Sequence, residues 1–318
     1  MASRYPSADL SKVRTISIKN RKSKVRLGDF AKPFDPHRAE FRNYLNSLPK
    51  LLVAKDLQEF VGHILRSRKR NKPVVLLIGA HVIKVGLSPL IIDLLNKKMV
   101  TAVAMNSAAA IHDVECAMWA RTSEDVAENL QDGTFGMSKE TGDFINKTLS
   151  AALKEDGVGY GEALGRELMR RKAPHRRVSV LATCYRLGVP VTVHAAIGTD
   201  IVHQQPTMSG AATGELSFRD FKILCRVVSG LVGGGVVMNW GSAVIMPEVF
   251  LKALTVARNL GSRAKGFVTA NFDMIQHYRP TMNILHRPTL DGGKWYHFTG
   301  HHEIMVPLLA AMIKQRLR

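Results

Sequence analysis

The chain has 318 residues, of which 46% are hydrophobic and 22% are charged. This composition is typical of a globular protein with one large or two modest domains, and it excludes collagen-like, fully disordered and disulfide-scaffold proteins. No apolar run approaches the roughly 18 residues that span a bilayer, and the N-terminus lacks the apolar core of a signal peptide. Cys116, Cys184 and Cys225 are few and widely spaced, which favours a reducing, cytoplasmic setting.

The chain is strongly basic, with 45 Lys and Arg against 26 Asp and Glu and a formal net charge of +19. Residues 1–72 hold 18 of the basic and 6 of the acidic residues, with clusters at 19–26 and 66–70. Such clusters can bind nucleic acid. A solvated arm and a basic helix end also explain them, because cations stabilise the carboxyl end of a helix. Since neither interleaved aromatics nor a nucleic-acid-binding motif is present, we rank nucleic-acid binding below the other functions and expect no membrane partner.

Taken in chain order, residues 1–36 contain three prolines and little periodicity, which predicts an extended arm with little core of its own. A short apolar run over 73–78 ends at Gly79 and predicts a strand that is buried on both faces. Residues 122–172 are expected to form helices alone. Further apolar runs predict strands at 100–105, 189–194, 235–239 and 266–270. Helical spacing predicts helices over 38–49, 55–70, 90–95, 108–119, 178–187, 217–229 and 246–260.

This alternation predicts an α/β fold with a doubly wound, mostly parallel, Rossmann-like sheet, preceded by a basic N-terminal helical arm. We expect two parts, a basic arm with helices over residues 1–71 and an α/β domain over residues 72–318. In an open parallel sheet, ligands bind beyond the carboxyl ends of the strands.

Five segments follow the predicted strands, and most contain small or polar residues just before a helical stretch: residues 79–81, 106–110, 194–200, 239–242 and 269–273. Small residues let backbone N–H groups approach a ligand, and a helix N-terminus favours a phosphate group. Asp200 and Asp273 either form structural turns or bind a hydroxyl or ammonium group. No GxGxxG fingerprint is present, so a dehydrogenase-type site is not supported. His301, His302 and Glu303 lack a metal-binding spacing, and we expect no metal site.

At these segments the sequence resembles the deoxyhypusine synthase family, over roughly residues 72–312. The likeness rests on five segments in the same order: 79–86, 99–113, 198–203, 269–273 with the following 279–280, and 306–309. The family uses NAD to oxidise the polyamine spermidine. It holds the aminobutyl group as an imine on an enzyme lysine and passes it to a lysine of an acceptor protein.

The resemblance therefore implies an NAD-dependent aminobutyl transferase that acts on a polyamine or related amine. It also implies a homotetramer, in which the N-terminal arm packs on a neighbouring subunit. Asp200 and Asp273 would face the cationic substrate. The residues that the resemblance places at the cofactor are Gly79, Ala80, His81, Ser107, Ala108, Gly241, Ser242, Thr269, Ala270, His301 and His302.

The chain departs from the family where the imine-forming lysine stands, because residues 279–288 contain no lysine. Arginine cannot replace it, since an imine needs a deprotonated primary amine. The family's motif Gly-Gly-Gly-Val-Val-Lys-His-His can be aligned with this chain in two registers, and the histidine pair is missing from this chain in both. We prefer the register that aligns residues 240–242 with the glycine turn. Lys294, beside Trp295, is the first candidate for a relocated nucleophile, because desolvation there would lower its pKa. A solvent-facing turn lysine is the alternative.

Two other functions stay open. One is an NAD-binding paralogue without transfer activity, either regulatory or with different amine chemistry, and the other is a nucleic-acid-associated protein that uses the basic arm. The net charge repels a polycation at long range, although physiological salt screens that field beyond about 8–10 Å. Local carboxylates such as Asp113, Asp200 and Asp273 would have to overcome it.

Overall fold

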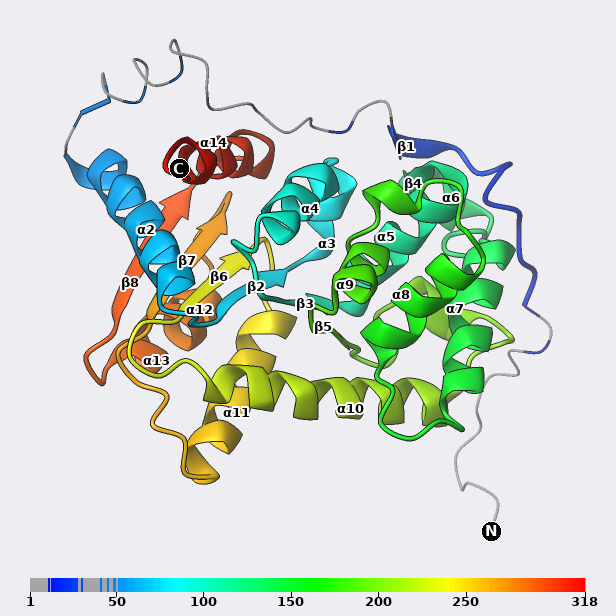
Figure 1. The fold of residues 1–318 in the computed structure, drawn as a ribbon. Helices are drawn as coiled ribbons and strands as arrows, with labels where there is room; N and C mark the ends of the chain where they lie inside the picture. The colour runs from blue at the N-terminus through cyan, green and yellow to red at the C-terminus, as the bar shows by residue number, and fades with distance from the viewer. Residues whose placement is uncertain are drawn as a thin grey trace.

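The computed structural model describes residues 13–27 and 51–317, together with Ser11, Phe30, Phe41, Leu45, Leu48 and Pro49. A six-stranded sheet forms its centre in the order β5-β3-β2-β6-β7-β8, and its pairings are parallel (Figure 1). Its strands are β2 (Val74–Ile78), β3 (Ala102–Asn106), β5 (Val191–His194), β6 (Val236–Trp240), β7 (Val268–Asp273) and β8 (Lys294–Thr299). The predicted α/β fold with a doubly wound, parallel sheet is confirmed.

Helices cover both faces of this sheet. The longer ones are α2 (Leu52–Lys69), α4 (Ser88–Asn96), α5 (Ser107–Trp119), α7 (Lys139–Ala152), α8 (Tyr160–Arg170), α9 (Val180–Leu187), α10 (Gly210–Ser229), α11 (Ile245–Asn259) and α14 (His302–Gln315). The shorter ones are α3 (Ala80–Lys84), α6 (Val126–Gln131), η3 (Arg176–Val178), η4 (Ile201–Gln204), α12 (Tyr278–Pro280), η5 (Thr281–His286) and α13 (Arg287–Thr289). Among the described helices, none has the length and apolar content to cross a membrane.

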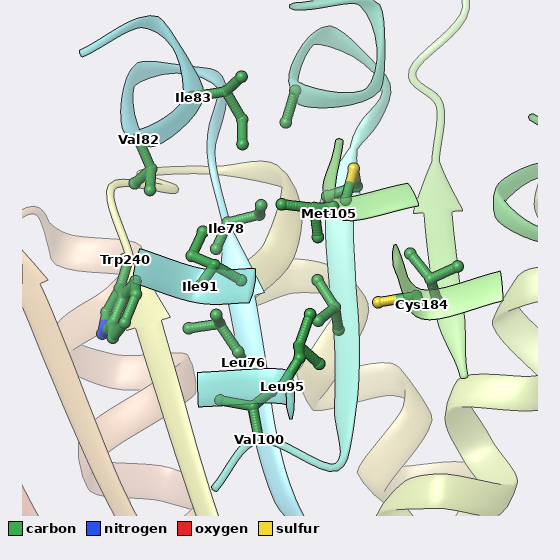
Figure 2. Packing of buried hydrophobic residues seen from close by; sticks show 14 of the residues in the cluster. Leu76, Ile78, Val82, Ile83, Ile91, Leu95, Val100, Met105, Cys184 and Trp240 are labelled. Carbon is green, nitrogen blue, oxygen red and sulfur yellow. The ribbon is translucent and has the colours of Figure 1, made fainter. Parts of the chain in front are cut away.

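Strand β2 shows how the sheet is buried. All five of its residues are buried, as the continuous apolar run predicts. Leu76 and Ile78 face a core that α2, α4 and α14 complete, and Figure 2 shows them beside Ile91 and Leu95 of α4. Val75 and Leu77 belong to a second core, which α10 and α11 complete on the other face. Alternate side chains of one strand therefore serve the two layers of helices.

Helix α2 lies against the edge of the sheet through an aromatic cluster. The ring of Phe60 lies 5.9 Å from Phe272 of β7, and 5.5 Å and 5.8 Å from Tyr296 and Phe298 of β8. Aromatic side chains each bury about 150–250 Å² and dominate the energetics of such contacts. The basic helix that the sequence predicts over 55–70 is therefore anchored on the sheet.

Two elements differ from the sequence analysis. The segment 122–172 does not consist of helices alone, because it opens on β4 (Arg121–Glu124), which pairs antiparallel with β1 (Ser23–Arg26). Strand β8 was not predicted. Burial alternates along it, with Tyr296 and Phe298 packed on α2 and the neighbouring side chains exposed, so it lacks the continuous apolar run of the other strands.

The described part of the N-terminal arm contributes to the core. Ile18 and Arg21 are buried, and the backbone of Ile16 bonds to residues that flank α7. The arm packs on the rest of the chain, since the partners of Arg21 are more than 90 residues away in sequence. The predicted helix over 38–49 lies largely outside the described residues.

Asp113 does not face a substrate, in contrast to the sequence analysis. It is fully buried on α5, where its carboxylate accepts hydrogen bonds from the Ser179 hydroxyl (2.5 Å) and from the backbone N–H groups of Val180 (2.7 Å) and Leu181 (3.2 Å). These groups form the N-terminus of α9 and carry no intrahelical partner. Burial raises the pKa of Asp113 to about 6 in spite of these bonds. Asp113 therefore holds α9 against α5.

Asp220 of α10 is a second buried carboxylate that joins separate elements. Its Oδ2 atom accepts hydrogen bonds from the backbone N–H groups of Gly161 (2.8 Å) and Val193 (2.7 Å), whereas Oδ1 has no partner among the described residues. Burial raises its pKa to about 8, above the ordinary value of 3.8. The folded state therefore retains a proton that the unfolded state releases, and stability falls as the pH rises between these two values.

We expect Asp220→Asn to melt at a higher temperature than the wild type at alkaline pH. The stability of this variant should also fall much less than that of the wild type as the pH rises. The amide oxygen can accept the same backbone hydrogen bonds without placing a charge in the core. Thermal unfolding followed across the pH range tests this, with the surface change Asp143→Asn as the control. A decline with pH that matches the wild type would contradict the assignment.

Candidate functional site

The order of the sheet defines a place where ligands bind. Numbered in chain order, the six parallel strands run 3-2-1-4-5-6, and the order reverses between β2 and β6. In sheets of this kind the chain leaves the two neighbouring strands toward opposite sides, and ligands bind in the crevice expected at their carboxyl ends. The arrowheads in Figure 1 mark this edge. The segments after β2 and β6, which the sequence analysis singled out, therefore lie side by side.

Two glycines are in contact at this crevice. The backbone N–H of Gly79 donates to the carbonyl of Trp240 (2.9 Å), and that of Gly241 donates to the carbonyl of Phe272 (3.1 Å). A Cβ atom on Gly79 would lie 2.1 Å from the Gly241 carbonyl oxygen, and Gly241 has a φ of +66°. Neither position tolerates a side chain without a shift of the backbone. Ala80 follows Gly79 as the first residue of α3.

Two histidines flank the glycines. The Nε2–H of the buried His302 donates to the Phe272 carbonyl (3.1 Å), and the His81 ring lies edge-on to the His302 ring at 5.6 Å. Burial lowers the pKa of His81, and His302 lowers it further. Within the described chain, His302 Nδ1 and the Trp240 indole N–H are buried without a partner. His301 is exposed, and its Nδ1 atom lies 3.6 Å from the Glu303 carboxylate.

A chain of amides continues from the crevice toward β8. Asn239 Nδ2 donates to Asn271 Oδ1 (2.7 Å), and Asn271 Nδ2 donates to Gln276 Oε1 (2.9 Å). Gln276 Nε2 donates in turn to the Thr299 hydroxyl (3.1 Å). Asn239 and Asn271 are fully buried. The segments 239–242 and 269–273 of the sequence analysis include these two residues, but neither was given a role, because an asparagine next to an apolar run gives no sign of its partner on the next strand.

Two of the predicted residues at this edge stabilise local backbone. The Ser242 hydroxyl accepts from the backbone N–H of Met246 (3.1 Å) at the start of α11. Asp273 Oδ1 accepts from the backbone N–H of Met274 (2.8 Å), and the side chain is largely buried. Ser242 and Asp273 therefore lie near the crevice, and both hold the turns that leave the sheet.

A cavity of about 150 Å³ lies beside the crevice, at the carboxyl ends of β3 and β5. A cavity of about this size can hold a benzene molecule. Its lining comes from α3, α5, β4, η4 and the N-terminal segment: Arg21, Lys84, Ala108, Ile111, His112, Ser123, Glu124, Val126, Phe135, Thr199, Asp200 and Ile201. Ser123 is a non-glycine residue with a φ of +60°, a strained backbone of the kind that is concentrated at functional sites.

Asp200 is the carboxylate at the floor of this cavity. The Ser107 hydroxyl donates to its Oδ2 atom. Its own backbone N–H donates to His203 Nδ1 (3.3 Å), and His203 Nε2 lies 3.8 Å from the carboxylate. Burial raises the pKa of Asp200 and lowers that of His203. Both the predicted Ser107 and the predicted Asp200 are thus at one site, with Ala108 beside them.

Lys84 reaches the same cavity from the end of α3. It is half-buried, and it makes neither a hydrogen bond nor an ion pair with any described residue. The sequence analysis included it in the segment 79–86 but gave it no role. The sequence could have indicated Lys84, because this residue follows His81 by about one helical turn in the short helix that starts at the crevice.

A buried ion pair forms one wall of the cavity. Arg21 donates to both carboxylate oxygens of Glu115 (3.0 Å each), and its guanidinium also lies 3.5 Å from Glu124. The Thr122 hydroxyl donates to Glu115 (2.5 Å) and bonds the His112 ring (2.5 Å). Burial raises the pKa of Glu115, but His112 and Arg21 together outweigh it and bring the pKa to about 2.

Three predicted residues do not lie at the site. Thr269 and Ala270 are fully buried inside β7, opposite Val237 and Met238, because the strand continues to Asp273. Lys294 begins β8 and pairs with the first residue of β7, so it lies at the amino edge, about 17 Å of strand away from the carboxyl edge.

The chemistry of Lys294 also differs from the expectation. Its ammonium group donates to Glu59 of α2 (2.6 Å), and this bond raises its pKa rather than lowering it. The prediction of Lys294 as a nucleophile at the cofactor is therefore wrong. Among the described residues, no group of three or more His, Cys, Asp or Glu side chains could hold a metal ion.

No protein-family model matches the sequence, and no curated protein matches it. Several solved structures share the fold. A protein from Entamoeba histolytica assigned as a deoxyhypusine synthase aligns with 89% of this chain and 96% of its own, at 11% identity and a TM-score of 0.50. A LOR/SDH protein from Methanococcus maripaludis S2 aligns with 90% of this chain and 74% of its own, at 12% identity and a TM-score of 0.53.

The cyanobacterial arginine dihydrolase ArgZ aligns with 84% of this chain at 13% identity and a TM-score of 0.51. This chain spans about a third, 34%, of the length of ArgZ. At these identities the likeness shows a common fold and nothing finer. The resemblance to deoxyhypusine synthases is therefore a distant relationship at the level of the fold.

Proposed function

We propose that the protein is an NAD-dependent transferase of the deoxyhypusine synthase type, which binds NAD at the β2–β6 crevice and the end of a polyamine in the adjoining cavity. The observation that carries this proposal is the convergence of Asp200, Ser107 and Lys84 on one cavity at the carboxyl edge. The fold shared with the protein from Entamoeba histolytica over nearly the whole of both chains supports it. A homotetramer and an acceptor protein lysine are parts of the same proposal.

The crevice has features that fit a dinucleotide. Gly79 and Gly241 place no side chain at these strand ends, and the His302 ring, whose Nδ1 atom is buried without a partner among the described residues, lies beside Gly241. One feature departs from the usual dinucleotide site, in which an acidic residue at this strand end binds the ribose. Here Asn106 ends β3, and its side chain accepts from the Ala109 N–H (3.0 Å) to cap α5. When bound, NAD would accept a hydride from the carbon next to a substrate nitrogen.

The cavity suits one end of an amine rather than a whole polyamine. Its volume matches about one small ring, and a four-carbon aminoalkyl group is of that size. Arg21 is already neutralised by Glu115 and Glu124, which leaves Asp200 as the carboxylate available to an ammonium group. A bound cation would favour the ionised form of Asp200 and offset the effect of burial on its pKa.

Lys84 supplies the primary amine that residues 279–288 lack. Its unpaired Nζ atom can attack the C=N carbon of an oxidised amine, so that a new C=N bond to Lys84 forms and the departing amine leaves with a proton. Arginine cannot perform this exchange. The alternative function, an NAD-binding paralogue without transfer, is favoured by the same absence of a lysine at 279–288.

Trapping of the lysine adduct tests the proposal. The protein is incubated with NAD and spermidine, borohydride is added, and labelled peptides are mapped by mass. We expect an adduct on Lys84 that disappears in Lys84→Arg and persists in the matched variant Lys294→Arg. The charge is retained in both variants, so a difference between them reports the amine itself.

Three outcomes would count against it. An adduct that persists on another lysine in Lys84→Arg would exclude Lys84 as the carrier. Binding of NAD in calorimetry without an adduct on any lysine would favour the paralogue without transfer activity. The absence of any heat or melting shift with NAD would contradict the cofactor as well.

A further inference from the structure

The amino edge of the sheet, opposite the candidate site, gathers basic residues from separate loops. Because the strands are parallel, the loops that precede them meet at this edge. They comprise residues 70–73, 97–101, 188–190, 230–235, 260–267 and 290–293, and Asp291 is the one acidic residue in their sequences. Asp291 already lies close to Lys265 (3.5 Å) and Arg258 (3.7 Å).

A cleft of about 510 Å³ lies between two of these loops. It is lined by Arg68, Asn71, Lys72, Pro73, Lys98 and Thr101, and no carboxylate is among them. Arg68, Lys72 and Lys98 form no ion pair with any residue that the structure describes. Three unpaired cations around one concave surface produce a positive field, which attracts an anion.

A second cleft of about 620 Å³ runs along α2. Lys55, Glu59, His63, Arg66, Lys294 and Arg316 line it with Gln58 and Gly62. The acid Glu59 is held by Lys294 at 2.6 Å and has Lys55 at 3.9 Å. Helix α2 has 18 residues, which corresponds to about 27 Å, and both clefts lie along it.

The helix dipole does not account for the whole surface. It explains Arg66, Arg68 and Lys69 in the last turn of α2. It does not explain Lys72 and Lys98, which come from the loops before β2 and β3 and join Arg68 only in the folded chain. The first cleft also lacks aromatic and long aliphatic lining residues, which a membrane-binding surface would insert into lipid.

We propose that this amino edge binds the phosphate backbone of a nucleic acid. Lys and Arg neutralise phosphates with the release of counterions, and this binding requires no sequence-specific contact. The surface is separate from the carboxyl edge, so the inference does not depend on the proposed transferase activity.

The test is fluorescence anisotropy with labelled 20-nucleotide RNA and DNA of mixed sequence, measured over a series of salt concentrations. The variant Arg68→Glu/Lys72→Glu/Lys98→Glu reverses the charge of the first cleft. The control Lys139→Glu/Lys154→Glu/Arg177→Glu changes the net charge equally at exposed positions elsewhere. Both variants are first checked for the wild-type melting temperature.

We expect the cleft variant to bind about tenfold or more weakly at low salt, with a shallower salt slope by about 0.7 for each phosphate contact that is lost. The control should bind nearly as the wild type does. Equal affinity for RNA and DNA would indicate that the protein recognises the phosphate backbone alone. A preference for one of them would indicate which nucleic acid the protein binds. Equal weakening in the control, or binding to anionic vesicles in place of nucleic acid, would overturn the proposal.

Discussion

Arg21→Ala should lower the free energy of unfolding by about 3–5 kcal/mol, because it leaves the Glu115 carboxylate buried without its partner. Both side chains are almost completely inaccessible, at 1% and 0% exposure, and the pair is bidentate. Urea unfolding measures the loss. The adjacent change Lys22→Ala is a matched control, since its pair with Glu128 is exposed and should contribute less than about 1 kcal/mol.

The double variant Arg21→Met/Glu115→Gln separates the charge from the packing. It removes both charges together, so it should recover a large part of the stability that Arg21→Ala loses. A double variant that is no more stable than Arg21→Ala would show that the loss comes from packing of the arginine side chain. Lys22→Ala with a loss equal to that of Arg21→Ala would contradict the special role of the buried pair.

The same pair determines how the protein responds to acid. The folded pKa of Glu115, about 2, lies below the ordinary value of 4.5. The stabilisation is therefore present above the ordinary value and is lost as the pH falls from there toward the folded value. Arg21→Ala should lose stability less steeply over this acidic range than the wild type does, because the main charge that lowers this pKa after His112 is gone.

The sequence predicts the sheet well where strands are buried on both faces. The run at β2 and the small residues after β2 and β6 are visible in the sequence, and the reversal of strand order brings Gly79 and Gly241 together. The end of β7 was placed three residues too early, because Asn271 and Asp273 look like the start of a loop. Asn271 stays inside the strand because Asn239 satisfies its amide oxygen.

Other features depend on contacts between distant residues. Arg21 belongs to a basic run that reads as solvated, and only the fold brings it 94 positions across the sequence to Glu115. Lys294 follows a glycine turn near the missing lysine, yet the direction of β8 places it at the amino edge. The cleft at Arg68, Lys72 and Lys98 likewise depends on which loops the sheet brings together.

Gly79→Ala should destabilise the fold by about 3 kcal/mol, the upper part of the range for overpacking a tightly filled site. The added methyl carbon would lie 2.1 Å from the Gly241 carbonyl oxygen and 3.1 Å from the Ser242 nitrogen, so backbone must move on at least one side of the crevice. Because Gly79 joins β2 to α3, the movement would displace His81 and Lys84 together. We therefore expect Gly79→Ala to lose the NAD-induced rise in melting temperature as well.

Gly214→Ala is the matched control for this prediction. It makes the same chemical change inside α10, where a methyl carbon would meet no atom within 4 Å, and it should stabilise the protein by about 0.5–1 kcal/mol. Urea unfolding of the two variants and the wild type measures the expected loss for Gly79→Ala and the expected gain for Gly214→Ala in the free energy of unfolding. A Gly79→Ala protein as stable as the wild type would show that β2 and β6 do not approach so closely at their carboxyl ends. The place assigned to NAD would then have a different shape, since both glycines lie there.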